Sequence, residues 1–131
     1  MTRISMTETS MTEALGRFLD VDVARYKLIS TNLANIDTPG YRTRDLDFRA
    51  ELTRAAAADF GLDGGQLASQ ANPIAHQVHG LMERPDGNNV SLERESLLLA
   101  EAQMKYNLGV QLLKDQFHQI SMAINSGGTT S

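Results

Sequence analysis

The feature that most constrains the fold of this chain is a long run of regularly spaced apolar residues near the carboxyl end. Alternating steps of three and four separate its members, which are Leu99, Ala102, Tyr106, Val110, Leu113, Phe117, Ile120 and Ile124. This spacing places all of them on one face of an α-helix. Ser91 can cap the start of that helix, and Gly127 and Gly128 follow its last turn. We therefore predict a helix over residues 91–126.

A second run of apolar residues with this spacing lies near the amino end, and we call each such run a seam. It consists of Leu15, Phe18, Leu19, Tyr26, Ile29, Leu33 and Ile36, and polar Asp22 occupies the slot that breaks it. The sequence SMTE at 10–13 is a capping box, in which a serine and a glutamate each satisfy a backbone N–H of the first turn. The ring of Pro39 disfavours helical geometry at Thr38. These signals together predict a helix over residues 10–37.

Both helices carry more apolar surface than one seam. The additional stripes are Val21, Ala24 and Leu28 in the first helix and Leu98, Met104, Leu108 and Leu112 in the second. Two such helices in a chain of 131 residues should pair, but pairing buries only one stripe of each. A third helix over residues 51–60 could absorb some of the remainder in a compact bundle. Because exposed stripes of this extent are unusual in monomers, we expect other chains to cover them.

The segment between the helices, residues 38–90, is less regular. Pro39 and Gly40 suit the middle of a type II turn. From Arg42 to Arg49 the residues alternate, which predicts a short extended segment with Leu46 and Phe48 on one face and Asp45 and Asp47 on the other. Residues 61–89 are rich in Gly, Pro, Asn and Gln, and we expect a loop with a short hairpin there. The predicted fold is one mainly α domain over residues 1–131, with a coiled-coil-like pair of terminal helices and an irregular middle.

Composition excludes several classes of function. The net charge is −4 and no basic stripe is present, which argues against nucleic-acid binding. The longest apolar run, 97–100, is far shorter than the ~20 residues that span a bilayer. The first ten residues lack the apolar core of a cleavable signal peptide. Cysteine is absent, which removes disulfides and thiolate chemistry and is compatible with export of an unfolded chain.

No pattern predicts catalysis, a small-molecule substrate or a cofactor. His76 and His79 could share a metal, but the sequence places no third ligand beside them. The sequence DGNN at 86–89 lacks the alternating acidic ligands and the closing glutamate of a calcium loop, so a turn is the better interpretation. No nucleophile with a partnered base can be proposed either. We expect a protein that is not an enzyme.

Two blocks of sequence resemble one known family. NLAN at 32–35 and TPGY at 38–41 are similar to the amino-terminal motif of bacterial flagellar rod, hook and hook-associated proteins. The continuation RDLDF at 44–48 narrows the resemblance to a proximal rod protein. DGNNV at 86–90, ERE at 93–95 and QMKYN at 103–107 agree with the same pattern. Residues 52–82 have no such match, and Ile36 and Asn89 differ from the residues most expected at their positions.

The resemblance implies a structural role and a set of partners. Such a protein is a subunit of the rod that joins the membrane ring to the distal rod and hook. It is exported by the flagellar type III apparatus without a cleavable signal and folds as it polymerises in the periplasmic rod. Its implied partners are other rod proteins, copies of itself, adaptor proteins of the membrane ring and rod base, and the export apparatus.

The resemblance also implies that the exit of the first helix is an assembly joint. Asn32 and Asn35 can offer amides to open carbonyls at the helix end or to an adjacent subunit, and Tyr41 supplies a ring with a polar tip. Arg42, Arg44, Asp45 and Asp47 can pair with charges on neighbours. The candidate interface residues are Asn32, Leu33, Asn35, Asp37, Thr38, Pro39, Gly40, Tyr41, Arg44, Asp45, Asp47, Phe48, Tyr106, Val110, Leu113, Phe117 and Ile120.

Two other functions compete with the rod subunit. A two-helix adaptor or export chaperone would use the same stripes to hold a client, but it would not need the residues 32–48. A small metalloprotein using His76 and His79 is the third hypothesis, which elemental analysis would test.

The motif TPGY also has a simpler interpretation. An ordinary turn after a helix would explain TPGY alone, although not the longer matched string.

Overall fold

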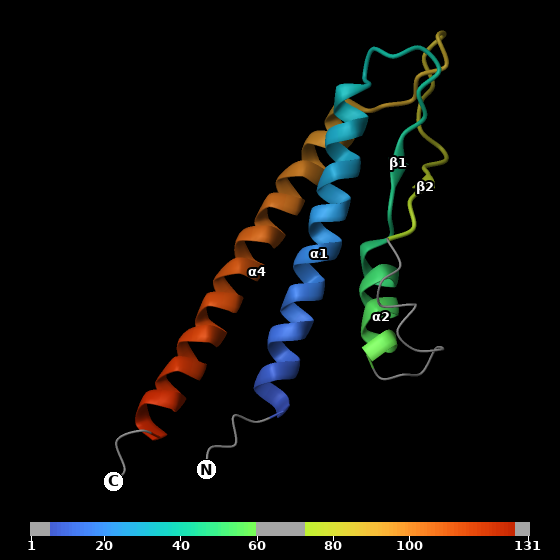
Figure 1. Cartoon of the computed structure of the whole chain (residues 1–131). Helices are drawn as coiled ribbons and strands as arrows, with labels where there is room; N and C mark the ends of the chain where they lie inside the picture. The colour runs from blue at the N-terminus through green and yellow to red at the C-terminus, as the bar shows by residue number, and fades with distance from the viewer. Residues whose placement is uncertain (1–5, 60–72, 128–131) are drawn as a thin grey trace.

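A computed structural model describes residues 6–59 and 73–127. Two long helices, α1 (Met6–Ala34) and α4 (Leu92–Gly127), lie side by side and run in opposite directions. Helix α2 (Phe48–Asp59) and the strands β1 (Arg44–Asp45) and β2 (His76–Gln77) lie along another side of α1 (Figure 1). The start of α1 and the end of α4 are at the same end of the molecule. The fold is mainly helical, as the sequence predicted.

The predicted helices exist, but α1 starts four residues earlier and ends three residues earlier than predicted. Ser91 is the N-cap of α4, because its hydroxyl oxygen accepts a hydrogen bond from the backbone N–H of Arg94 at 3.3 Å. Helix α1 begins at Met6 and continues through Ser10, so the capping box predicted there does not form. At the other end α1 stops at Ala34, and one further turn covers residues 35–37.

The predicted extended segment after the turn is shorter than expected. Only Arg44 and Asp45 form β1, and they pair antiparallel with Gln77 and His76 of β2. The ladder therefore joins distant segments and is not a local hairpin. The predicted alternation of faces is also wrong, since Asp45 and its neighbour Leu46 are both buried. Residues 60–72, part of the predicted loop, lie outside the described residues.

Helix α2 begins earlier than predicted because Asp47 caps it. The Asp47 carboxylate accepts a hydrogen bond from the backbone N–H of Ala50 at 3.1 Å, so Phe48 is the first helical residue and not part of a strand. The Phe48 ring packs edge-on against Phe18 of α1 with centroids 5.2 Å apart. The Lys105 ammonium of α4 lies 4.1 Å from the centroid of the same ring. Phe48 thus attaches α2 to both long helices.

The described interior is largely polar. Its buried apolar residues are Val21, Ile29, Leu46 and Ala102, and its buried polar residues are Asp22, Asn32, Thr43, Asp45, Glu51, Asn88, Asn89 and Glu95. Polar groups are buried favourably only when they are hydrogen-bonded. The arrangement of α1, α4 and the β-strands therefore depends on specific polar contacts as well as on apolar packing.

The side of α4 that faces α1 differs from the predicted seam. Ala102 and Gly109 are buried there, whereas Tyr106, Phe117 and Ile124 of the predicted seam are about half exposed. At Gly109 the two helices approach closely, because a Cβ atom would lie 2.7 Å from Leu19 Cδ2. The contact side differs from the predicted seam because glycine has no Cβ atom, which lets α1 approach α4 most closely at Gly109.

Exposed apolar residues lie on both flanks of this contact side of α4. The Leu97 stripe consists of Leu97, Met104, Leu108, Leu112 and Met122, and the Tyr106 stripe consists of Leu92, Tyr106, Phe117 and Ile124. At 100° per residue, the two stripes fall on opposite sides of Ala102 and Gly109. Helix α4 therefore has one partnered and two unpartnered apolar surfaces. No helix in the described parts of the chain is long and apolar enough to cross a membrane.

Candidate functional site

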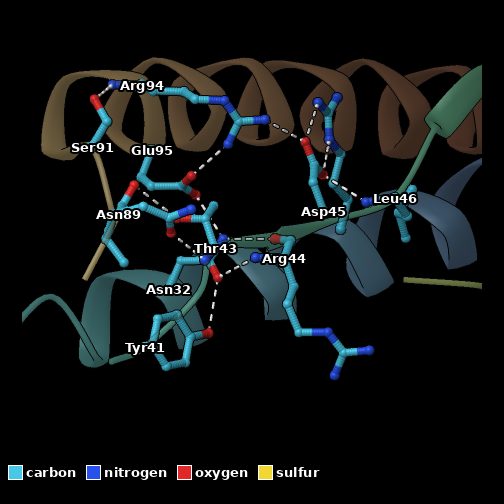
Figure 2. A network of polar contacts seen from close by, with 12 residues as sticks. Asn32, Tyr41, Thr43, Arg44, Asp45, Leu46, Asn89, Ser91, Arg94 and Glu95 are labelled. Atoms are coloured by element: carbon cyan, nitrogen blue, oxygen red, sulfur yellow. Dashed lines mark hydrogen bonds and ion pairs between the residues drawn. The ribbon is translucent and has the colours of Figure 1, made fainter. Parts of the chain in front are cut away.

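The exit of α1, the start of α4 and strand β1 meet in a network of polar side chains (Figure 2). We call the central members of this network the polar joint: Asn32, Tyr41, Asp45, Arg94 and Glu95. These residues come from the two sequence blocks that carry the family resemblance. The fold brings the two blocks into direct contact.

Asn32 uses every polar atom of its amide inside the chain. Its Nδ2 donates to the backbone oxygen of Arg44 at 2.7 Å and to Glu95 Oε2 at 3.1 Å. Its Oδ1 accepts from Tyr41 Oη at 2.9 Å and from the backbone N–H of Arg44 at 3.1 Å. Because Asn32 is 1% exposed, no water can replace a lost partner. Only a side chain with one donor and one acceptor end fits this position.

Arg94 connects two buried carboxylates. It donates from Nη1 to Glu95 Oε1 at 2.6 Å and from Nη2 to Asp45 Oδ2 at 2.9 Å. Glu95 is completely buried, so its charge requires these partners. Arg94 and Asn32 together satisfy both oxygens of Glu95. The first turn of α4 is thereby bonded to the last turn of α1.

Asp45 is the point at which β1 is held against both long helices. Arg25 of α1 donates from Nε to Oδ1 at 3.1 Å and from Nη2 to Oδ2 at 3.2 Å, and Oδ2 also accepts the bond from Arg94. Burial alone would raise the pKa of the Asp45 carboxyl, but the bonds and charges of the two arginines and the Leu46 N–H outweigh it, and its pKa is lowered. Asp45 therefore stays ionised and paired inside the chain.

Asn88 caps the carboxyl end of α1 from a distant part of the sequence. Its Nδ2 donates to the backbone oxygens of Asn35 at 3.0 Å and Thr38 at 2.9 Å. Arg84 donates to the backbone oxygen of Ile36. The Asn35 and Thr38 oxygens also accept from the backbone N–H groups of Thr38 and Tyr41, so Asn88 adds a second donor to carbonyls of the turns that follow α1. The segment DGNNV at 86–90, although distant in sequence, thus binds the chain where it leaves the first helix.

The predicted type II turn forms and contacts this cap. The backbone N–H of Tyr41 donates to the Thr38 oxygen at 3.2 Å, and Gly40 has a φ of 74°, as the third position of such a turn requires. The Gly40 N–H donates to the Asp86 oxygen at 2.9 Å. A Cβ on Gly87 would lie 3.4 Å from Gly40 Cα, so the two glycines allow the turns to touch.

The predicted site residues fall into three groups. Asn32, Tyr41 and Asp45 belong to the polar joint, and the side chains of Arg44 and Asp37 are exposed beside it. Leu33, Asn35, Thr38, Pro39 and Gly40 form the end of α1 and the turn, while Asp47 and Phe48 start α2. Tyr106, Val110, Leu113, Phe117 and Ile120 lie along α4, away from the joint. That the set contacts neighbouring subunits stays a prediction.

Within one chain, the helix-exit residues already have partners. Tyr41 bonds to Asn32, and Asp45 bonds to two arginines, so these groups are not free to bond a neighbour. Arg42 is paired with Glu83 at 3.0 Å on the surface. Asn35 donates to the backbone oxygen of Thr31 at 2.8 Å, which matches the predicted use of its amide at the helix end.

Sequence reasoning missed the partners of these residues. Arg25, Asn88 and Arg94 were not predicted as members of the site, and Glu95 was interpreted only as a favourable charge in the first turn of a helix. One signal was available for Glu95. It lies three and seven residues before Leu98 and Ala102, on the side of α4 that faces α1. A carboxylate at such a position must find a partner.

The described residues offer little for metal binding. His76 and His79 are both exposed, and no three His, Cys, Asp or Glu side chains in residues 6–59 and 73–127 are grouped as a metal site requires. The joint instead holds three backbone segments at fixed positions. Its chemistry is that of a structural connection.

The ends of the two antiparallel helices and the capped TPGY turn carry the two sequence blocks that resemble flagellar axial proteins. The chain is 30% identical to the flagellar basal body rod protein FlgB of Escherichia coli over 122 residues, which cover 83% of this chain and 88% of that protein. It is also 30% identical over 122 residues to FlgB of Borreliella burgdorferi, covering 82% and 90% of the two chains. FlgB of Salmonella typhimurium is 29% identical over 122 residues, covering 83% and 88%. No protein-family model matches the chain.

The chain belongs to the FlgB family of flagellar basal body rod proteins.

Proposed function

We propose that this chain is a structural subunit of the proximal rod of the flagellar basal body and polymerises through its terminal helices. The observation that carries this proposal is the exposure of two apolar stripes on α4. Leu97 and Met104 are 70% and 72% exposed in the first stripe, and Phe117 is 54% exposed in the second. Large exposed apolar surfaces mark sites of association.

The polar joint supports the same role. It fixes α1, α4 and β1 relative to one another through Asn32, Asp45 and Glu95. The apolar stripes therefore point in defined directions, which is what a subunit needs to contact several neighbours at once. We infer a structural and not a catalytic role for this cluster, since its charged groups are bonded to one another.

The partners that we propose are the other rod proteins, copies of this chain, and the adaptor proteins of the membrane ring and rod base. We also propose that the flagellar type III apparatus exports the chain to the periplasmic rod. The absence of cysteine supports passage as an unfolded chain, because no disulfide can form on the way. An adaptor or chaperone role has no comparable support, because the curated relatives are named as rod proteins.

Complementation of a deletion strain tests the proposal. The strain that lacks this chain should be non-motile and should lack rods, and the wild-type chain should restore both. Leu108→Ser and Phe117→Ser each remove apolar surface from one stripe and should abolish rod assembly while export continues. His118→Ser is the matched control, since His118 is exposed on α4 outside both stripes. Normal rods in both stripe variants would refute the proposal.

A further inference from the structure

A groove runs between α1 and α4 on the side of the Tyr106 stripe. It has a volume of about 530 Å³, and Val23 and Tyr26 of α1 and Tyr106 and Asn107 of α4 line its sides. Asp22, which is 1% exposed, lies at its base. The groove lies about two helical turns from the polar joint along the helix pair and shares no residue with it.

Asp22 is an unusual residue to find at the base of this groove. Its Oδ1 atom is buried and has no hydrogen-bond partner in the structure. Two cations lie near it but are engaged elsewhere: Lys105 pairs with Glu101 at 2.9 Å, and Arg25 pairs with Asp45 at 3.1 Å. A buried acceptor without a partner costs free energy, so its persistence calls for a donor from outside the chain.

We propose that this groove receives helix α4 of a second copy of the chain, with Lys114 of that copy donating to Asp22. The inference rests on the proposed polymerisation and adds a specific contact to it. The ammonium of Lys114 supplies the hydrogen-bond donor that Asp22 Oδ1 lacks and adds a positive charge that is not engaged by another carboxylate.

The position of Lys114 on α4 fits this contact. Helix α4 carries the cations Arg94, Lys105 and Lys114, and within the described residues only Lys114 has no ion-pair partner. It lies four residues after Val110 and three before Phe117, so all three side chains share one side of the helix. The lysine stem can then lie on apolar surface while its ammonium enters the groove.

The contact joins two different parts of the surface and can repeat. Lys114 lies seven residues beyond Asn107, the last groove residue of α4, which corresponds to roughly 10 Å of helix. A copy that inserts Lys114 into the groove of its neighbour still presents its own groove to the next copy. Contacts of this head-to-tail kind form open assemblies, as a rod requires.

Disulfide cross-linking in basal bodies tests the contact. Because the chain has no cysteine of its own, only the introduced cysteines of this chain can form the cross-link. A chain with Val23→Cys in the groove and Val110→Cys beside Lys114 should form a ladder of disulfide-linked multimers on oxidation. The pair Val23→Cys and Gln119→Cys, with the second cysteine exposed on the other side of α4 from Lys114, is the control and should stay monomeric. No cross-link in rods that contain the double-cysteine chain would overturn the inference but leave the proposed function intact. A cross-linked dimer without higher multimers would overturn it as well.

Variants that change the charge of Lys114 or Asp22 provide a second, independent test of the contact. Lys114→Glu should reduce motility to the level of the deletion strain without changing the thermal midpoint of the isolated chain, and Lys114→Arg should restore motility. Lys27→Glu, at an exposed lysine of α1, is the matched control. Asp22→Leu should raise the thermal midpoint of the isolated chain and yet abolish rod assembly. If Lys114→Glu assembles normally, or Asp22→Leu improves stability with no loss of assembly, the proposed pair does not exist.

Discussion

Asn32 and Glu95 lie 63 residues apart in the sequence and share a buried hydrogen bond of 3.1 Å. This bond joins the last turn of α1 to the first turn of α4. Each of the two residues also bonds a third segment, since Asn32 holds the backbone of Arg44 and Glu95 binds Arg94, which in turn holds Asp45. The two helices and β1 are thus fixed to one another by side chains that no water can substitute.

Replacing Asn32 by aspartate should weaken the fold strongly. Asn32→Asp keeps the shape but removes the donor, and it places a second carboxylate against Glu95. We expect the free energy of unfolding to fall by about 3 kcal/mol, since several buried groups lose their partners. Urea unfolding of the isolated chain measures this. Asn35→Asp is the control, because the Asn35 amide makes an exposed bond to the backbone of Thr31, and a loss there as large as at Asn32 would contradict the account.

Asp45 should make stability depend on acid. Its pKa is lowered from the ordinary value of 3.8, so folding favours the ionised form. The stabilisation is fully present above pH 3.8 and should be lost as the pH falls below it. Asp45→Asn should cost about 2 kcal/mol at neutral pH, because charged hydrogen bonds are lost. The difference between wild type and variant should shrink below pH 3.8, as thermal unfolding across pH would reveal.

Asp22 should show the opposite dependence on pH. Burial raises its pKa, while the charges of Lys105 and Arg25 lower it and that of Glu101 raises it, and the net change is upward from 3.8. The folded chain therefore disfavours the ionised form. This cost is fully present above the raised pKa and disappears as the pH falls to 3.8. Asp22→Asn should stabilise the isolated chain at neutral pH and have little effect in acid. Equal effects of Asp22→Asn at both pH values would argue against a raised pKa.

The close approach at Gly109 can be tested with a matched glycine. A Cβ at Gly109 would lie 2.7 Å from Leu19 Cδ2 and 3.2 Å from Phe18 Cδ1, whereas one at Gly16 of α1 would meet no atom within 4 Å. Gly16→Ala should stabilise the chain by up to about 1 kcal/mol through helix propensity. Gly109→Ala has the same propensity gain but must displace Leu19, so it should be less stable than Gly16→Ala by about 1–3 kcal/mol. Equal stability of the two variants would mean that the helices do not meet at Gly109.

The sequence predicted the helices well because their signals are local. Periodic apolar residues, the Ser91 cap and the Pro39–Gly40 turn each act within a few positions. The same local reasoning failed at Ser10, where the capping box lies inside α1 because residues before it continue the helix. A box of this kind favours a start only if nothing upstream is helical.

The partners in the polar joint could not be predicted in this way. Asn32 was identified from its motif, but its bond to Glu95 depends on the register of α1 against α4, which no short stretch encodes. Asp45 looked like a surface charge on an alternating strand, and its burial follows from two arginines on separate helices. The Asn88 cap likewise acts 53 and 50 residues from the carbonyls that it binds.

The central claim is that other chains complete the native state by covering the stripes on α4. Hydrogen exchange of the backbone amides tests this directly, in the dilute isolated chain and in purified basal bodies. We predict rapid exchange along the part of α4 beyond Gly109 in the isolated chain and slow exchange of the same amides in the rod. Strong protection of the whole of α4 in the dilute monomer would contradict the claim, because the helix would then be stable without neighbours.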